Sequence, residues 1–464
     1  MPSYRATLLA LRVPVFVKRP FAFPRPGWKF WLVVAACLGL AEAAGAALGA
    51  QAAVAGVQRL TRYYAGHPPA QDDALDQVTR GFRFNLIGWE ARELGRWAFD
   101  ALATPPGVPA PAELSAVNRF FELGAAMQRA ELRLAAADSD AARSQARAGI
   151  QTLRRERDAI ETTARRTVTR LVTVQMQQSG LGYRAPGHIG VLPPVAFTVV
   201  RPPSVLVIAP RDRIKLERTT ILQPGLADGD GERMEADAEA LGWSAIVAPT
   251  GGFSTYPTII SDSVPLDFTL QTVGHEWMHT YLFFHPLGFN YFSSSDMRTI
   301  NETVANLVGR EVARGIRRST LPPPVTPALA PATPQPATAT PADPAAEPPF
   351  DFNREMRTTR LEAERLLTEG RVAEAEGYME DRRKLLVAHG YTIRKLNQAY
   401  FAFHDLYADT PGSVSPIGPA LEQLLQKTGS VQAFVRSLQD VASYAGYQQV
   451  LARYGIAETP PRQP

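Results

Sequence analysis

Two histidines four residues apart, with a glutamate directly after the first, form the most constraining feature of this 464-residue chain. They are His275 and His279, and the glutamate is Glu276. Because residues i and i+4 of an α-helix lie on one face, both imidazoles can reach one metal ion. Glu276 then lies beside the ion's open coordination position, where it can accept a proton. The spacing therefore predicts a helix with a metal site. The alternative is an amphipathic helix that carries two histidines by chance.

A third ligand is needed, because a catalytic zinc ion binds three protein side chains and leaves its fourth position to water. Glu302 follows an asparagine at the expected start of a second helix, 302 − 279 = 23 positions after His279. With this Asn-Glu pair the chain resembles the gluzincins, the superfamily of thermolysin and the zinc aminopeptidases, over roughly residues 205–316. The resemblance implies that His275, His279 and Glu302 bind Zn²⁺ and that Glu276 is the general base.

The chain departs from the gluzincin pattern at one position. Four residues after the third ligand, thermolysin-like enzymes have an acidic residue that orients a ligand histidine, and this chain has Asn306. An amide oxygen can still accept the imidazole N–H, although with less charge. Gly309, seven residues after the ligand, matches the pattern. The glutamate by which aminopeptidases hold a substrate's free amine is absent between residues 247 and 263, so exopeptidase specificity is not supported.

A competing third ligand is His285, six positions after His279, where the metzincins place their third histidine. In that family a glycine lets the helix turn sharply toward the metal. This chain has Leu282 at the equivalent position, and a bulky residue is strained in that conformation. His285 also precedes a proline at the end of the helical pattern, where it can simply cap the helix. We therefore favour Glu302 and keep His285 as the alternative.

The N-terminal region predicts a membrane anchor. Residues 1–29 carry six basic side chains and no acidic one, and residues 30–57 are apolar apart from Glu42 and Gln51. A basic tail before an apolar segment of this length predicts a cytoplasmic N-terminus and a single-pass helix in the lipid bilayer, with the rest extracytoplasmic. The alternatives are signal cleavage near residue 41, which would give a secreted or periplasmic protein, and an alanine-rich helix of a soluble domain. The only cysteine, Cys37, lies in this segment, so no intramolecular disulfide can form.

The rest of the chain predicts an α-rich mixed α+β fold with a helical hairpin, a small sheet and active-site helices. Four regions are expected: a helical region, a gluzincin-like catalytic domain, a linker rich in Pro, Ala and Thr, and a helical C-terminal domain, at residues 58–180, 181–320, 321–349 and 350–464. Within the first region, residues 113–136 and 140–178 form the hairpin. Arginines on its second helix alternate with acidic residues, which is typical of a solvated face, so no nucleic-acid partner is expected.

Short β-branched runs bounded by Pro and Gly predict the strands, at residues 195–200, 205–209, 214–222, 243–247 and 251–260. The last of these strands precedes the metal-binding helix. In gluzincins the strand in this place is a sheet edge that pairs with extended substrate. The metal-binding helix itself is expected at residues 268–284, with Asp267 as its cap.

The C-terminal domain is expected to complete the site. Peptide hydrolysis builds an oxyanion at the scissile carbon, and in gluzincins a Tyr or His downstream of the third ligand stabilises it. Tyr400, His404 and Tyr407 are spaced i, i+4 and i+7 on one helix face. We expect Tyr400 to be the donor, with His404 as the alternative. An aromatic stripe of this kind also occurs simply as part of a core.

The sequence therefore predicts a membrane-anchored zinc metallopeptidase that hydrolyses a peptide or protein substrate. The alternative from another class is a zinc-binding scaffold without catalysis. The presence of Glu276 argues against a scaffold, because a scaffold needs the ligands but not the base.

Overall fold

The computed structural model describes residues 74–86, 88–90, 92–93, 107–185, 188–321, 350–408, 410 and 413–458. The chain divides into two compact units, Met1–Gln71 and Asp72–Pro464, and all described residues belong to the second. The predictions for the basic tail, the membrane anchor and residues 322–349 of the linker lie outside the described residues. Within the described ranges, no helix is long and apolar enough to cross a membrane.

The second unit is helix-rich with small sheets, which confirms the predicted α-rich mixed α+β class. Its described helices are α3 (Ala74–Val78), α5 (Pro111–Ala135), α6 (Asp140–Gln178), α7 (Asp230–Ala240), α8 (Leu266–Leu282), α9 (Pro286–Phe289), α10 (Ser295–Ser319), α11 (Phe352–Thr368), α12 (Val372–Ala388), α13 (Gln398–His404), α14 (Ile417–Thr428), α15 (Val431–Leu438) and α16 (Tyr444–Arg453). Its described strands are β1 (Gly182–Ala185), β2 (His188–Val191), β3 (Phe197–Val199), β4 (Ser204–Pro210), β5 (Arg218–Leu222), β6 (Trp243–Pro249), β7 (Gly252–Phe253) and β8 (Thr258–Ile260).

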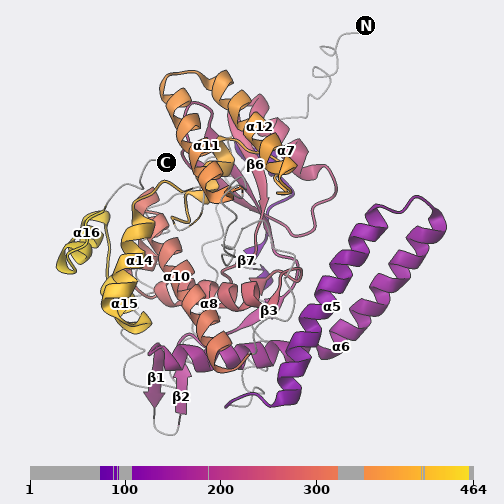
Figure 1. The fold of residues 1–464 in the computed structure, drawn as a ribbon, viewed down its shortest axis with the longest axis vertical. Coiled ribbons are helices and arrows are strands. Elements are labelled where there is room, and N and C mark those ends of the chain that lie inside the picture. The colour runs from indigo at the N-terminus through magenta and orange to yellow at the C-terminus, as the bar shows by residue number, and fades with distance from the viewer. Residues whose placement is uncertain are drawn as a thin grey trace, which may run out of the picture. The chain divides into compact units, whose positions relative to one another are not determined.

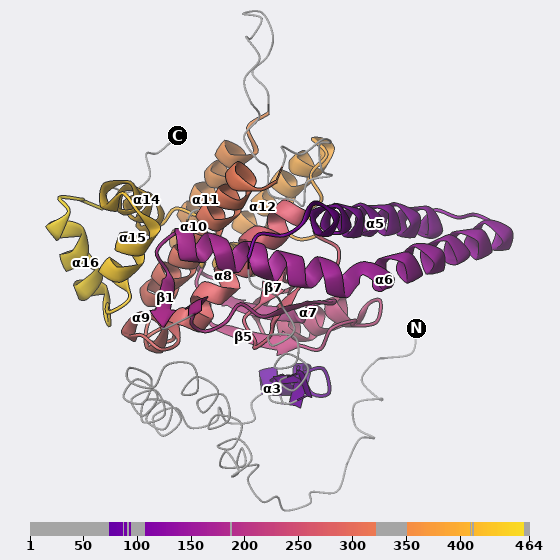
Figure 2. The same ribbon diagram turned by 90° about the horizontal axis from the view of Figure 1, so that it is seen from below.

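Helices α5 and α6 form the predicted antiparallel hairpin (Figure 1), and its second helix has the expected bounds. The hydroxyl of Ser139 accepts a hydrogen bond from the backbone N–H of Ala142 and so starts α6. The apolar stripe of α6 is buried mainly in its C-terminal half, at Val168, Leu171 and Val172. This half packs against α8 and α10 (Figure 2), so the hairpin is part of the wall around these two helices.

The strands form three small sheets. One has the antiparallel order β5-β4-β6, and a second pairs β1 with β2. The third has the order β3-β8-β7, in which β3 and β8 are parallel and β7 is an outer strand. The single strand predicted at residues 251–260 is wrong, because it divides into β7 and β8 around Pro257, which has no N–H for a ladder. The strand predicted at residues 214–222 begins only at Arg218.

The C-terminal helices belong to the same compact unit as the sheets and helices α8 and α10. Helices α14, α15 and α16 share one core with α6, α8 and α10, and α13 packs against β4 and β6. Leu321, placed in the linker by the sequence, is instead buried in this core with 4% of its surface exposed. A leucine gains about 1.5–3 kcal/mol from full burial, which favours the packing of this residue into the core.

Helices α8 and α10 cross at two glycines, Gly274 and Gly309. A Cβ atom on Gly274 would lie 3.1 Å from the Cα of Gly309 and 3.3 Å from the Cβ of Val312. A Cβ atom on Gly309 would lie 3.0 Å from the backbone N of His275. Because neither glycine has a side chain, the two helix backbones approach closely just where α8 carries its first histidine.

We predict that Gly309→Ala destabilises the fold by about 1–3 kcal/mol, because the added methyl group overpacks the helix crossing. Gly377→Ala is the matched control: it lies in α12, and a Cβ there meets nothing within 4 Å. This control should gain about 0.5–1 kcal/mol from the better helix propensity of alanine. Denaturant unfolding of both variants measures the difference. Equal stability of the two variants would show that the close approach of α8 and α10 is not required.

Candidate metal centre

Helix α8 places His275, Glu276 and His279 where the sequence predicts them. The helix begins two residues earlier than expected, with Pro265 as its N-cap, so the prediction that Asp267 caps it is wrong. Asp267 instead lies in the first turn and pairs with Arg317 at the end of α10.

The third converging side chain comes from α10. The Nε2 atoms of His275 and His279 are 3.0 Å apart, and Glu302 Oε2 lies 3.5 Å from the first and 3.3 Å from the second. Zinc bonds of about 2.0–2.1 Å in a tetrahedron separate the ligand atoms by about 3.3–3.4 Å. Glu302 Oε2 is also fully buried and makes no hydrogen bond. The three atoms therefore fit a divalent ion at their centre.

Asn301 fixes the orientation of His279. Its Oδ1 lies 2.8 Å from Nδ1 of His279, and its Nδ2 donates to the backbone oxygen of Leu287 at 3.3 Å. Since an amide oxygen can only accept, Nδ1 of His279 carries a proton and donates it to Asn301, and Nε2 is the ring nitrogen that faces the centre. The amide that contacts Nδ1 of His279 is thus Asn301, the residue directly before Glu302. Nδ1 of His275 is buried without a hydrogen-bond partner among the described residues.

Tyr291 is a site residue that the sequence did not single out. Its hydroxyl donates a short hydrogen bond to Glu302 Oε1, and its ring packs edge-on against His279 with centroids 6.1 Å apart. This contact occupies one carboxylate oxygen and leaves Oε2 facing the imidazoles. Tyr291 lies in the loop before α10, and no motif in the sequence distinguishes it from other loop tyrosines.

The charges of the centre suit a cation. Burial lowers the pKa of His279, but the carboxylate of Glu302 outweighs this effect and raises that pKa to about 9. Burial raises the pKa of Glu302, but His279 and His275 outweigh this effect and hold that pKa well below its usual range. Without a metal, the imidazole of His279 is therefore protonated and positively charged beside the carboxylate of Glu302. A divalent ion would take the place of that positive charge.

Glu276 lies beside the three converging atoms. One of its carboxylate oxygens lies within 4.8 Å of a ring nitrogen of each histidine, and burial raises its pKa. A Cβ atom on Gly252 would lie 2.9 Å from Glu276 Oε1, so the outer strand β7 passes directly over this carboxylate. The hydroxyl of Ser254 also donates to the backbone oxygen of Glu276, at 3.4 Å.

His285, the alternative third ligand, does not join the converging atoms. It is the N-cap of α9, and its Nδ1 lies 3.9 Å from the carboxylate of Asp440. Its ring packs against Tyr281 with centroids 4.6 Å apart. The geometry therefore favours Glu302 and contradicts the metzincin-like arrangement.

The C-terminal region reaches the centre through the segment after α13. The backbone N–H of Ala408 donates to Thr303 Oγ1 on α10 at 3.2 Å. This contact places Tyr407 beside the first histidine, with ring centroids of Tyr407 and His275 6.2 Å apart. Tyr400, the expected donor, packs among buried apolar residues of the C-terminal helices and β4, and burial raises its pKa to about 12.

His404, the alternative donor, packs against Tyr400 with ring centroids 4.3 Å apart. Burial lowers its pKa to about 4. Neither Tyr400 nor His404 makes a ring contact with His275 or His279 among the described residues. Of the predicted stripe, Tyr407 is thus the member that the structure brings to the histidines.

No family model matches this chain, and no curated protein or solved structure was found to be similar to it. The resemblance to gluzincins therefore depends on the motif and on the geometry of these side chains.

We predict a loss of stability between pH 7 and pH 5 that depends on His404. Its folded-state pKa of about 4 lies below the ordinary 6.5, so the neutral form stabilises the fold above pH 6.5, and this stability is lost as the pH falls toward 4. Linkage gives at most about 2 kcal/mol over this interval. His404→Gln, which cannot take up the proton, should reduce the pH dependence of the unfolding free energy by that amount.

His389→Gln is the matched control, because His389 is exposed at the end of α12. It should leave the pH dependence unchanged. If His404→Gln has the same pH dependence as the wild-type protein, His404 is not buried as a neutral side chain.

Proposed function

We propose that this protein is a zinc-dependent peptidase with His275, His279 and Glu302 as the metal ligands. The observation that carries the proposal is the convergence of three donor atoms from two helices at separations of 3.0–3.5 Å, which is close to the spacing of ligand atoms around tetrahedral zinc. Two imidazoles and a carboxylate are ligands that zinc accepts, and they leave a fourth position open. When bound, zinc lowers the pKa of a coordinated water toward about 7 and polarises a carbonyl group.

Glu276 is proposed as the general base. It is close to the ligand atoms but is not needed to complete the tetrahedral set. Its carboxylate takes a proton from the attacking water and later delivers that proton to the nitrogen of the leaving amine. The raised pKa of this buried carboxyl group suits a residue that both accepts and donates a proton.

Tyr407 is proposed as the donor to the oxyanion, in place of Tyr400. Support comes from its ring contact with His275. A phenol beside the metal can donate its O–H to the oxygen on which negative charge develops, and such donors contribute about 2.7–4 kcal/mol to catalysis. Tyr291 has its hydroxyl engaged with Glu302, so its role is to hold the ligand.

The substrate is proposed to be an extended peptide that pairs with the outer strand β7. This strand has only β8 as a partner within its sheet and runs over Glu276 at Gly252. Strand addition uses main-chain hydrogen bonds, which do not depend on the side chains of the peptide. The membrane anchor and the extracytoplasmic location remain predictions from the N-terminal sequence.

We predict that the purified full-length protein retains close to one zinc ion per chain after dialysis. His279→Ala and Glu302→Ala should each lose most of the metal, because each removes one of three protein ligands. His285→Ala is the matched control and should retain it. Elemental analysis measures the metal content. A folded protein without stoichiometric metal would contradict the proposal, and metal loss in His285→Ala alone would assign the third ligand to His285.

We predict that Glu276→Gln keeps the fold and the zinc but loses peptide hydrolysis by about 10²–10⁴-fold or more, because an amide cannot take the proton of the water. Initial rates on a cleavable peptide, normalised to bound zinc, measure this loss. Near wild-type turnover in a zinc-loaded Glu276→Gln sample would place the chemistry elsewhere. A protein that binds zinc tightly but cleaves no peptide in a library would be the scaffold instead.

The same assay distinguishes the two tyrosines. Tyr407→Phe should lower kcat by about 10²–10³-fold with the zinc content unchanged. Tyr400→Phe should have little effect on kcat. The opposite result would return the role of donor to Tyr400.

A further inference from the structure

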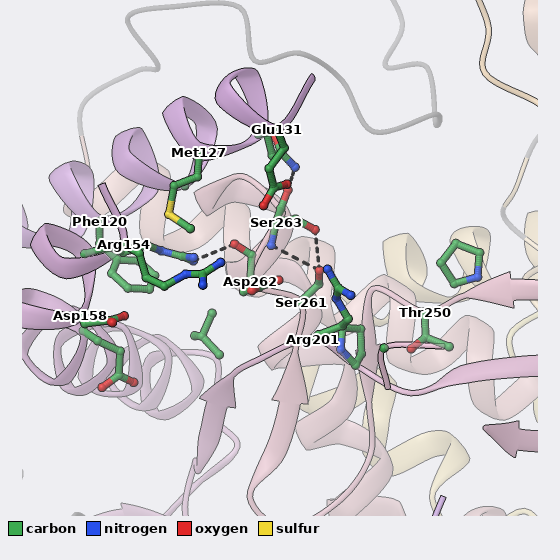
Figure 3. Close-up of a pocket in the computed structure, with 18 of the residues that line it drawn as sticks. Phe120, Met127, Glu131, Arg154, Asp158, Arg201, Thr250, Ser261, Asp262 and Ser263 are labelled. Atoms are coloured by element: carbon green, nitrogen blue, oxygen red, sulfur yellow. Dashed lines mark hydrogen bonds between the residues drawn. The ribbon is translucent and has the colours of Figure 1, made fainter. Parts of the chain in front are cut away.

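A cavity of about 600 Å³ lies between the α5–α6 hairpin and the ends of several strands (Figure 3). None of the proposed metal ligands lines it. Strands β3 and β8 run parallel, and the residues that follow them, Arg201 after β3 and Ser261 to Ser263 after β8, face this space. Ligands commonly bind outside the carboxyl ends of parallel strands, and this volume is typical of a small-molecule site.

Charged side chains of both signs line the cavity without pairing with one another. Among the described residues, the guanidinium groups of Arg154 and Arg201 have no carboxylate within 4.0 Å. The carboxylates of Glu131, Asp158 and Asp262 likewise have no Lys, Arg or His nitrogen within 4.0 Å. Figure 3 shows Arg154 and Arg201 on opposite sides of the space, with Asp262 and Ser261 between them. Opposite charges that share a small cavity but do not meet leave room for a ligand that can contact both.

A third arginine forms a fixed part of the wall. Arg157 is buried, its guanidinium stacks on Phe120 at 4.3 Å, and its Nη2 donates to the backbone oxygen of Asp262 at 2.7 Å. Gln128 donates to the next backbone oxygen of this connection, that of Ser263. The hairpin thus holds the segment that leads into α8, and Arg157 gives this wall of the cavity one buried and fixed side chain, whereas Arg154 and Asp158 beside it are exposed.

The charges of the lining balance. Three guanidinium groups face three carboxylates, Glu131, Asp158 and Asp262, while the further carboxylate Glu161 is paired with Arg165 at 2.8 Å. A simple anion such as phosphate would meet the three carboxylates, and a simple cation would meet the three guanidinium groups. A ligand with one charge of each sign at its two ends matches both sets.

We propose that this cavity is a second binding site, for short peptides with free amino and carboxyl ends. The carboxylate end binds Arg201 beside the hydroxyl of Ser261, and the ammonium end binds Asp158 on the hairpin. This site is separate from the metal centre and does not depend on the proposed hydrolysis. A bound peptide contacts residues 261–263, which lead into α8.

The test is a set of four tripeptides measured by calorimetry against zinc-loaded, full-length Glu276→Gln protein, which should not cleave them. They are tri-alanine with both ends free, with an acetylated amine, with an amidated carboxylate, and with both ends blocked. Each single block should weaken binding at least tenfold, because it leaves charged groups of the cavity unmatched. His279→Ala should leave the binding of free tri-alanine unchanged.

Two variants assign the ends. Arg201→Gln should weaken the binding of free tri-alanine. In this variant, amidation of the carboxylate should cause no further loss of affinity, while acetylation of the amine should still weaken binding. Asp158→Asn should show the converse pattern. Arg213→Gln is the matched control, because Arg213 is exposed and pairs only with its neighbour Asp212 among the described residues.

The proposal is overturned if the four peptides bind equally, if none binds at millimolar concentration, or if binding disappears in His279→Ala, which would place the peptide at the metal. The site would instead be an anion site if inorganic phosphate binds and is displaced by free tri-alanine, and if acetylation of the amine does not change the affinity of the peptide. Selective binding of the free peptide by a protein that cleaves nothing would uphold this site and contradict the proposed peptidase activity.

Discussion

The close crossing of α8 and α10 is the constraint on which the rest of the site depends. Gly274 and Gly309 let the two backbones approach closely at positions where an added Cβ atom would crowd the other helix. About two turns before Gly309, the same crossing brings Glu302 of α10 to the imidazoles of α8. Burying two histidines and two glutamates is unfavourable unless their charges are compensated. The protonated His279 beside Glu302 provides that compensation in the protein alone, and a divalent ion would provide more of it.

The surrounding elements fix the side chains that this crossing brings together. Asn301 sets the tautomer of His279, and Tyr291 occupies the outer oxygen of Glu302. Both contacts come from α10 or the loop before it, so one helix supplies a ligand and much of its support. Such supporting contacts matter for metal sites, because their loss typically costs about 10–100-fold in affinity or activity.

Distant parts of the chain also converge on α8. The hairpin holds the segment before it through Arg157 and Gln128, and the C-terminal region places Tyr407 beside His275. Strand β7 covers Glu276 at Gly252. These contacts hold α8 at its start and along the face that carries the histidines. A helix held in this way has little freedom, which favours a fixed geometry of its side chains. The charged cavity beside residues 261–263 lies at the first of these attachment points.

The sequence by itself determined the features that depend on local spacing. The helix with His275, Glu276 and His279, the Asn-Glu pair at residues 301 and 302, the hairpin and the α-rich mixed class all follow from periodicity and motif, because i and i+4 positions share a face in any α-helix. Tertiary structure decided which side chains meet. It selected Glu302 over His285, Asn301 over Asn306 as the partner of His279, and Tyr407 over Tyr400 as the neighbour of His275. These choices depend on where helices cross and how loops return, and such contacts between residues far apart in the chain leave no periodic pattern in the sequence.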